Sequence, residues 1–195
     1  MDNTTKKAIK DSDALTALLQ EVLSKKEAIR RNAFKALLSI SEEHPEVLYP
    51  KWDFFADLIG SDNASFKYIA IYIIANLTEI DTEKRFEKIF EKYYSLLDDE
   101  SVIPAAHVAG NSGKIARAKP GLQSKITDKL LGIDKTHHAP GRKELIEGYA
   151  IEAFGEYFAE AKDKKVILGF VEKQQKSKSP RTKKTAQKFL EKAGK

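Results

Sequence analysis

The sequence has 195 residues, of which 42% are hydrophobic and 32% are charged, and it contains no cysteine. A chain of this size buries roughly 70% of its unfolded surface, which suffices for one elongated domain. No run approaches the roughly 20 apolar residues that a membrane-spanning helix needs, and the start MDNTTKKAIKDSD lacks the apolar centre of a secretory signal. These features exclude a disulfide scaffold and a membrane-spanning protein, and they predict a cytoplasmic protein without a membrane partner.

Charge is distributed unevenly along the chain. Residues 1–100 carry 14 lysines and arginines against 19 acidic residues, whereas residues 101–195 carry 20 against 10. A basic half of this kind attracts polyanions or acidic protein surfaces. The alternative is that the lysines only keep polar helix faces in solution.

In chain order, residues 1–11 are expected to form an N-terminal tail and residues 12–195 a single all-α domain of helical pairs. The pairs are expected at about 12–48, 49–80, 81–118, 119–161 and 162–195. The second helix of each pair carries an alanine on its apolar face, and these alanines recur at intervals of 37, 36, 44 and 36 residues: Ala33, Ala70, Ala106, Ala150 and Ala186. The first helices carry an earlier apolar series: Leu19, Phe55, Phe90, Ile126 and Phe170. Regular spacing of this kind predicts an α-solenoid, in which each pair covers the apolar face of the next.

The second helix of the first pair has the most specific pattern. In IRRNAFKALLSI, the dipeptide Ile29-Arg30, then Ala33, then the dipeptide Ala36-Leu37 stand where HEAT repeats of the armadillo-like class have their characteristic residues. The segment VIPAAHVAGNSG is similar to the short HEAT repeats rich in alanine and glycine. The chain therefore resembles the HEAT-repeat family. This resemblance implies a right-handed α-α superhelix of about five HEAT-like pairs whose second helices line a concave face.

The residues that line the concave face are the candidates for partner binding. Positions near each buried alanine are expected to be exposed and to form a continuous stripe along this face. The candidate partner-binding residues are Arg31, Lys35, Tyr68, Tyr72, His107, Asn111, Tyr149, Glu152, Lys184 and Lys188. Tyrosine offers a flat amphipathic contact surface, and the cations steer an approaching partner. The alternative for Tyr68 and Tyr72 is that they pack between neighbouring helices.

One insertion breaks the period. Ile126 and Ala150 are 24 residues apart where the other pairs need 14 to 16, so about eight extra residues lie in a turn at 132–141. Such turns often carry contacts, and the candidate contact residues there are His137, His138, Arg142 and Lys143. The two histidines and Asp134 could contribute to a metal site, but a complete set of ligands at a recognised metal spacing is missing. We therefore expect neither a metal nor a cofactor.

These observations favour a non-catalytic scaffold that binds a protein partner through the concave face and the turn at 132–141. The alternative is nucleic-acid binding through the basic half. Some HEAT-like proteins are DNA glycosylases that act on alkylated bases, and this resemblance would implicate Glu152 or Glu156. However, the single tryptophan, Trp52, falls on a first helix. We expect no catalytic residue, and the sequence leaves the oligomeric state open.

Overall fold

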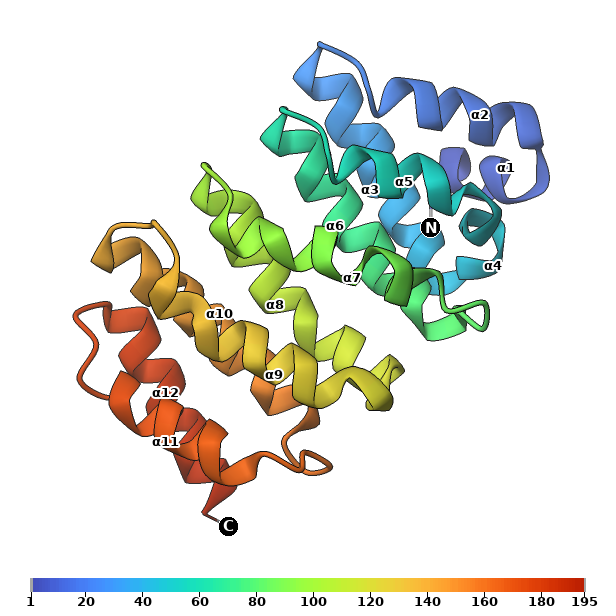
Figure 1. Ribbon diagram of the computed structural model, residues 1–195. Helices are drawn as coiled ribbons and strands as arrows, with labels where there is room; N and C mark the ends of the chain where they lie inside the picture. The colour runs from blue at the N-terminus through green and yellow to red at the C-terminus, as the bar shows by residue number, and fades with distance from the viewer. Residues whose placement is uncertain (1, 195) are drawn as a thin grey trace. The chain divides into compact units, whose positions relative to one another are not determined.

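The computed structural model describes residues 2–194, and its regular elements are helical throughout that range (Figure 1). The α-helices are α1 (Asn3–Lys10), α2 (Ser12–Glu21), α3 (Glu27–Glu43), α4 (Pro45–Leu48), α5 (Trp52–Leu58), α6 (Ala64–Leu77), α7 (Arg85–Ser95), α8 (Val102–Ala118), α9 (Gln123–Leu131), α10 (Pro140–Tyr157), α11 (Lys164–Gln174) and α12 (Pro180–Ala193). The 3-10 turns are η1 (Tyr49–Lys51), η2 (Thr78–Ile80), η3 (Leu96–Asp98), η4 (Pro120–Leu122) and η5 (Gly132–Lys135). The all-α class predicted from the sequence is confirmed. Among residues 2–194, no helix combines the length and the apolar character needed to cross a bilayer.

The chain divides into two compact units, Met1–Glu87 and Lys88–Lys195, and the boundary falls inside α7. Unit 1 contains α1 to α6, and unit 2 contains α8 to α12. The helices follow one another as pairs, with α2 and α3 first and α11 and α12 last. The expectation of one repeat domain over 12–195 stays a prediction.

The first residues differ from the expected tail at 1–11. They form α1, whose Thr5 and Ala8 are buried and which packs against α2 and α3. Asp2 caps this helix because its Oδ1 accepts hydrogen bonds from the Thr5 backbone N–H and hydroxyl, both at 2.8 Å. The sequence pattern missed the helix because one of its two buried side chains is polar.

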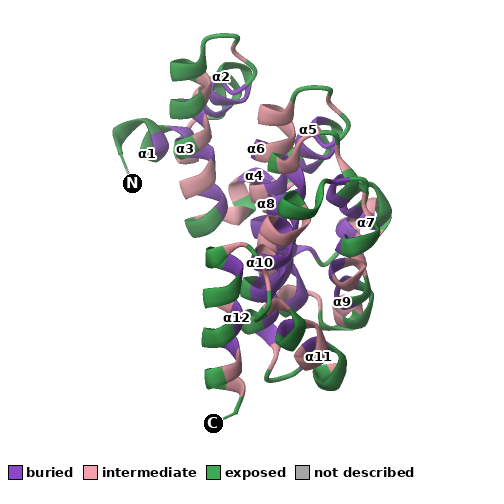
Figure 2. Ribbon diagram, turned by 90° about the vertical axis from the view of Figure 1, so that its left-hand side faces the viewer, coloured by how far each residue is buried: buried purple, intermediate pink, exposed green. Residues whose placement is uncertain are grey.

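Alanines mark the buried faces of the second helices, as predicted. In unit 1, α3 packs against α6, and Ala33 and Ala70 are buried. The buried Asn76 side chain of α6 donates to the Ser41 hydroxyl of α3 at 2.7 Å. In unit 2, α10 packs against α8 on one side and α12 on the other, and Ala106, Ala150 and Ala186 are all buried. Figure 2 shows buried residues along α8 and α10 and a row of exposed residues along α12.

Two glycines bring the second helices of unit 2 unusually close together. A Cβ atom at Gly113 of α8 would lie 2.7 Å from the Ala153 carbonyl oxygen and 2.9 Å from the Ala153 Cα on α10. A Cβ atom at Gly148 of α10 would lie 2.6 Å from the Thr182 hydroxyl oxygen on α12. All three distances are shorter than a real Cβ atom shows, so a side chain at Gly113 would force α10 backbone to shift, and one at Gly148 would force the Thr182 side chain to shift. Close backbone approach thus fixes which side chains of α8, α10 and α12 become neighbours.

We predict that Gly113→Ala destabilises the protein by about 1–3 kcal/mol, because the new methyl group meets α10 backbone that cannot move aside. The matched control is Gly169→Ala in the middle of α11, where an added Cβ meets no atom within 4 Å. That change removes the backbone-entropy cost of a helical glycine and should stabilise by about 0.5–1 kcal/mol. Urea unfolding of both variants measures the difference. Equal stability of the two variants would contradict the close contact.

Candidate partner-binding face

Four side chains from three successive second helices meet on one face of unit 2. They are His107 of α8, Tyr149 and Glu152 of α10, and Arg181 of α12, and we call them the Tyr149 cluster. The His107 and Tyr149 ring centres are 5.8 Å apart. The Arg181 Cζ atom lies 4.2 Å from the Tyr149 ring centre. The guanidinium donates to the Tyr149 hydroxyl at 2.9 Å and to the Glu152 carboxylate at 3.2 Å.

The glycine contacts explain why these side chains converge. Tyr149 follows Gly148, and Arg181 precedes Thr182, so the close approach of Gly148 and Thr182 brings arginine and tyrosine together. The Thr182 hydroxyl also donates to the Glu144 carbonyl oxygen at 2.7 Å, which ties the start of α12 to α10. On the other side, a Cβ at Gly110 would lie 3.2 Å from Tyr149 Cδ1, so Gly110 leaves room for the ring.

Electrostatics divide the cluster into a neutral and a charged part. Burial, followed by the neighbouring Arg181 charge, lowers the pKa of His107 below its usual 6.5. The lowered pKa favours the neutral form of the imidazole. Hydrogen bonds to Tyr149 and Glu152 raise the pKa of Arg181, so its guanidinium stays charged. The face thus offers a tyrosine ring stacked beneath a permanently charged guanidinium.

An open groove of about 410 Å³ runs between α10 and α12 beside this cluster. Glu152 and Glu156 line it from α10, and Lys188 and Lys192 line it from α12. Gly155 carries no side chain to fill the groove. Glu156 is also paired with Arg117 of α8, whose guanidinium nitrogen lies 3.1 Å from the carboxylate. Acidic and basic side chains therefore alternate from α8 to α12 across this face.

The predicted partner-binding residues of unit 2 differ in exposure and in their contacts. Lys184 and Lys188 are exposed, and Tyr149 and Glu152 belong to the cluster. Asn111 is only 8% exposed, and its amide nitrogen donates to the His107 carbonyl oxygen of its own helix at 2.9 Å. Its inclusion among exposed binding residues was therefore wrong, because the side chain turns back along α8.

Sequence reasoning missed Arg181. We considered only positions close to each buried alanine, and Arg181 lies five residues before Ala186. The first turn of α12 packs opposite the middle of α10, at Gly148, so Arg181 at the start of α12 faces Tyr149 in the middle of α10. The Gly148-Tyr149 dipeptide was a usable signal, because a helical glycine often marks close approach of another backbone.

The predicted aromatic residues of unit 1 form their own cluster. Phe34 of α3 lies edge-on to Tyr68 and Tyr72 of α6, with ring centres 5.4 Å and 6.1 Å away, and the two tyrosine rings are 4.9 Å apart. All three side chains are half-buried, whereas Arg31 and Lys35 on either side of Phe34 are exposed. The tyrosines therefore pack between neighbouring helices, which was the alternative to a binding role, and part of their surface remains exposed to solvent.

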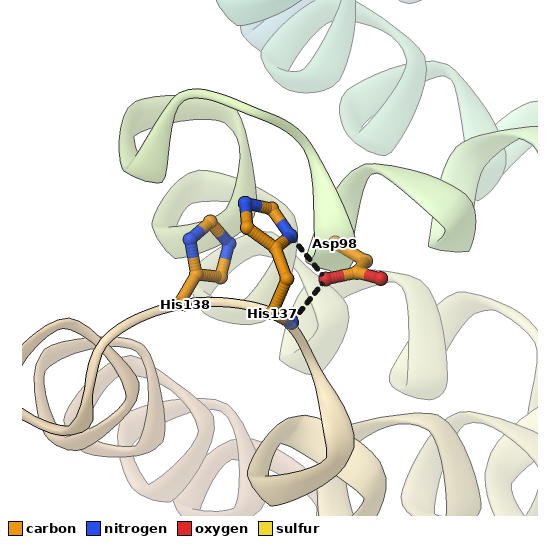
Figure 3. Close-up of side chains that lie close together, drawn as sticks. All are labelled: Asp98, His137 and His138. Atoms are coloured by element: carbon orange, nitrogen blue, oxygen red, sulfur yellow. Dashed lines mark hydrogen bonds and ion pairs between the residues drawn. The ribbon is translucent and has the colours of Figure 1, made fainter.

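Only some of the predicted contact residues at the turn 132–141 are exposed to solvent. His137 and Arg142 are exposed, but His138 is 6% exposed, so its assignment as a contact residue was wrong. The His138 Nε2 atom lies 3.2 Å from the Leu97 carbonyl oxygen, which draws the ring inward. The Lys143 ammonium donates to the Asp134 carbonyl oxygen at 2.8 Å. The acidic partner of the histidines is Asp98 of η3, with its carboxylate 2.6 Å from His137 Nδ1, and not Asp134 (Figure 3).

The residues considered for glycosylase chemistry are engaged in structural contacts. Trp52 is 1% exposed inside unit 1. Glu152 and Glu156 are each paired with an arginine of a neighbouring helix. The absence of a catalytic residue remains a prediction.

Comparison with known proteins identifies the architecture. A designed armadillo repeat protein superposes with a TM-score of 0.61 at 20% sequence identity, covering 96% of this chain and 84% of the designed one. No protein-family model matches the sequence. No curated protein matches it either. The likeness supports an armadillo-like α-solenoid repeat fold, while the assignment to HEAT repeats in particular stays a resemblance.

We predict that Tyr149 and Arg181 are energetically coupled. A double-mutant cycle with Tyr149→Leu and Arg181→Gln should give a coupling of about 0.5–1 kcal/mol in urea unfolding, as expected for a solvent-accessible cation–π pair. Replacing Arg181→Gln by Lys183→Gln, which changes an exposed neighbour, provides the control cycle. A coupling near zero in the first cycle would show that the stacked pair does not form in solution.

Proposed function

We propose that this chain is a non-catalytic scaffold that binds a segment of a protein partner along α8, α10 and α12. The observation that carries the proposal is the Tyr149 cluster, in which a half-buried tyrosine and an exposed arginine are stacked on a solvent-facing surface. Tyrosine and arginine are enriched among the residues that dominate binding energy at protein interfaces. An armadillo-like repeat fold is compatible with this role but does not by itself assign it.

The cluster is ordered before any partner arrives. Arg181 is held by both Tyr149 and Glu152, and Tyr149 stands in the space left by Gly110. A partner therefore does not have to immobilise the long arginine side chain, and the entropy cost of binding falls. The groove between α10 and α12 extends this surface with Phe189 and the stem of Lys188.

The charges of α12 indicate the chemistry of the partner. Lys184, Lys188 and Lys192 are all exposed and follow one another at four-residue intervals, so they share one side of the helix. This row attracts acidic side chains, while the Tyr149 cluster suits an aromatic or apolar side chain. We therefore propose a partner segment that carries acidic residues beside an aromatic anchor.

The same row of lysines supports nucleic acid as a second candidate, because exposed cations along one helix face contact phosphates in many complexes. The opposite side of the groove argues against it. Glu152 and Glu156 line that side, and a phosphate backbone following the groove would pass these carboxylates. A protein partner with mixed side chains is not repelled in this way.

The experiment is a pull-down from native lysate, performed with and without nuclease, using wild type and Lys184→Glu/Lys188→Glu. Lys173→Glu/Lys176→Glu is the matched control, since it reverses two exposed charges at α11 and the turn that follows it. We expect wild type and control to retain the same protein partner after nuclease, and the α12 variant to lose it. Loss of every partner on nuclease treatment would favour nucleic acid. Retention by the α12 variant would exclude this face.

A further inference from the structure

A second group of functional side chains lies away from the Tyr149 cluster, where the turn at 132–141 meets η3. It consists of Asp98, His137 and His138 (Figure 3). One nitrogen from each imidazole and one carboxylate oxygen lie within 4.8 Å of one another. Two imidazoles and a carboxylate are the ligand types that Zn²⁺ and related transition-metal ions bind, in contrast to the all-oxygen sites of Ca²⁺ and Mg²⁺.

The backbone brings the two histidines to the same side of the turn. The segment bends at both residues, and the His137 and His138 ring centres are 4.4 Å apart, with their planes differing by 37°. Imidazoles bound to one tetrahedral ion with metal–nitrogen distances of about 2.0 Å have ring centres roughly 5 Å apart. The two rings therefore lie close enough for each to turn one nitrogen toward the same ion.

Hydrogen bonds hold the group in place before an ion enters. The Asp98 carboxylate accepts from the His137 backbone N–H at 2.7 Å and lies 2.6 Å from His137 Nδ1. His138 Nε2 bonds to the Leu97 carbonyl oxygen at 3.2 Å. A backbone carbonyl contact of the kind that Leu97 makes orients ligand histidines in known metal sites. The Asp98 and His137 side chains are each a little over half exposed, which gives an ion access and allows them to adjust.

The required adjustment is small. Ligand atoms around an ion at about 2.0–2.2 Å lie roughly 3–3.5 Å apart, so separations that now reach at most 4.8 Å have to contract by no more than roughly 1.3–1.8 Å. Rotation of the exposed Asp98 and His137 side chains supplies this movement. Three protein ligands leave at least one coordination position for water.

We propose that Asp98, His137 and His138 form a binding site for a divalent transition-metal ion of the Zn²⁺ type. The ion would clip the long turn between α9 and α10 to the end of the α7–η3 segment. This site revises the expectation of no metal, which considered Asp134 as the acidic ligand. The distant Asp98, 39 residues before His137, supplies the third ligand that the sequence spacing lacked.

The test is titration of the full chain with Zn²⁺ by isothermal calorimetry in a non-chelating buffer. We expect one ion per chain, with affinity reduced at least about tenfold by both His137→Gln and Asp98→Asn, since loss of an outer-shell partner alone costs about that much. His44→Gln is the matched control, because His44 is also paired with a carboxylate, Glu46, at 3.2 Å but has no second histidine beside it. This control should keep the wild-type affinity.

His138 is buried, so His138→Asn is used only after circular dichroism shows that the variant is folded. A second measurement is the melting temperature, which Zn²⁺ should raise for wild type and His44→Gln but not for His137→Gln. Unchanged affinity in His137→Gln and Asp98→Asn would overturn the site. An equal loss of affinity in His44→Gln would do so too, because the ion would then bind surface histidines without distinction.

Discussion

The structure of unit 2 depends on the close approach of its second helices at two glycines. At Gly113 and Gly148 there is no space for a side chain, and the buried alanines extend the same close packing along the helices. Interiors packed this tightly do not deform continuously. The positions of α8, α10 and α12 relative to one another are therefore set within narrow limits, and so are the side chains on their outer faces.

The proposed binding face follows from that constraint. Tyr149 is next in sequence to the glycine that contacts α12, and Arg181 is next to the threonine on the other side of the same contact. A stacked arginine on a tyrosine is thus a consequence of how the helices meet. The metal site that we propose has a different origin, because an insertion lengthens one turn until it reaches the end of η3. The two sites share a unit but no residue, so one can fail without the other.

The sequence predicted the features that repeat. The alanine spacing located the second helices and their buried faces, since helical periodicity records burial directly. It did not predict pairings between residues far apart in the chain, such as Arg181 with Tyr149 or Asp98 with His137. Those depend on the register between helices, which a single sequence does not specify. The sequence also did not predict helix α1, because this helix buries a threonine where the pattern required an apolar residue.

Helices α8, α10 and α12 hold His107, Tyr149 and Arg181 together. The most direct measurement is an NMR titration of the His107 imidazole in wild type, Arg181→Gln and Lys183→Gln. We expect the pKa of His107 to lie below 6.5 in wild type, to rise in Arg181→Gln and to remain lowered in Lys183→Gln, because burial and the Arg181 charge both disfavour the imidazolium. A pKa at its ordinary value in wild type, or one that Arg181→Gln leaves unchanged, would contradict the account.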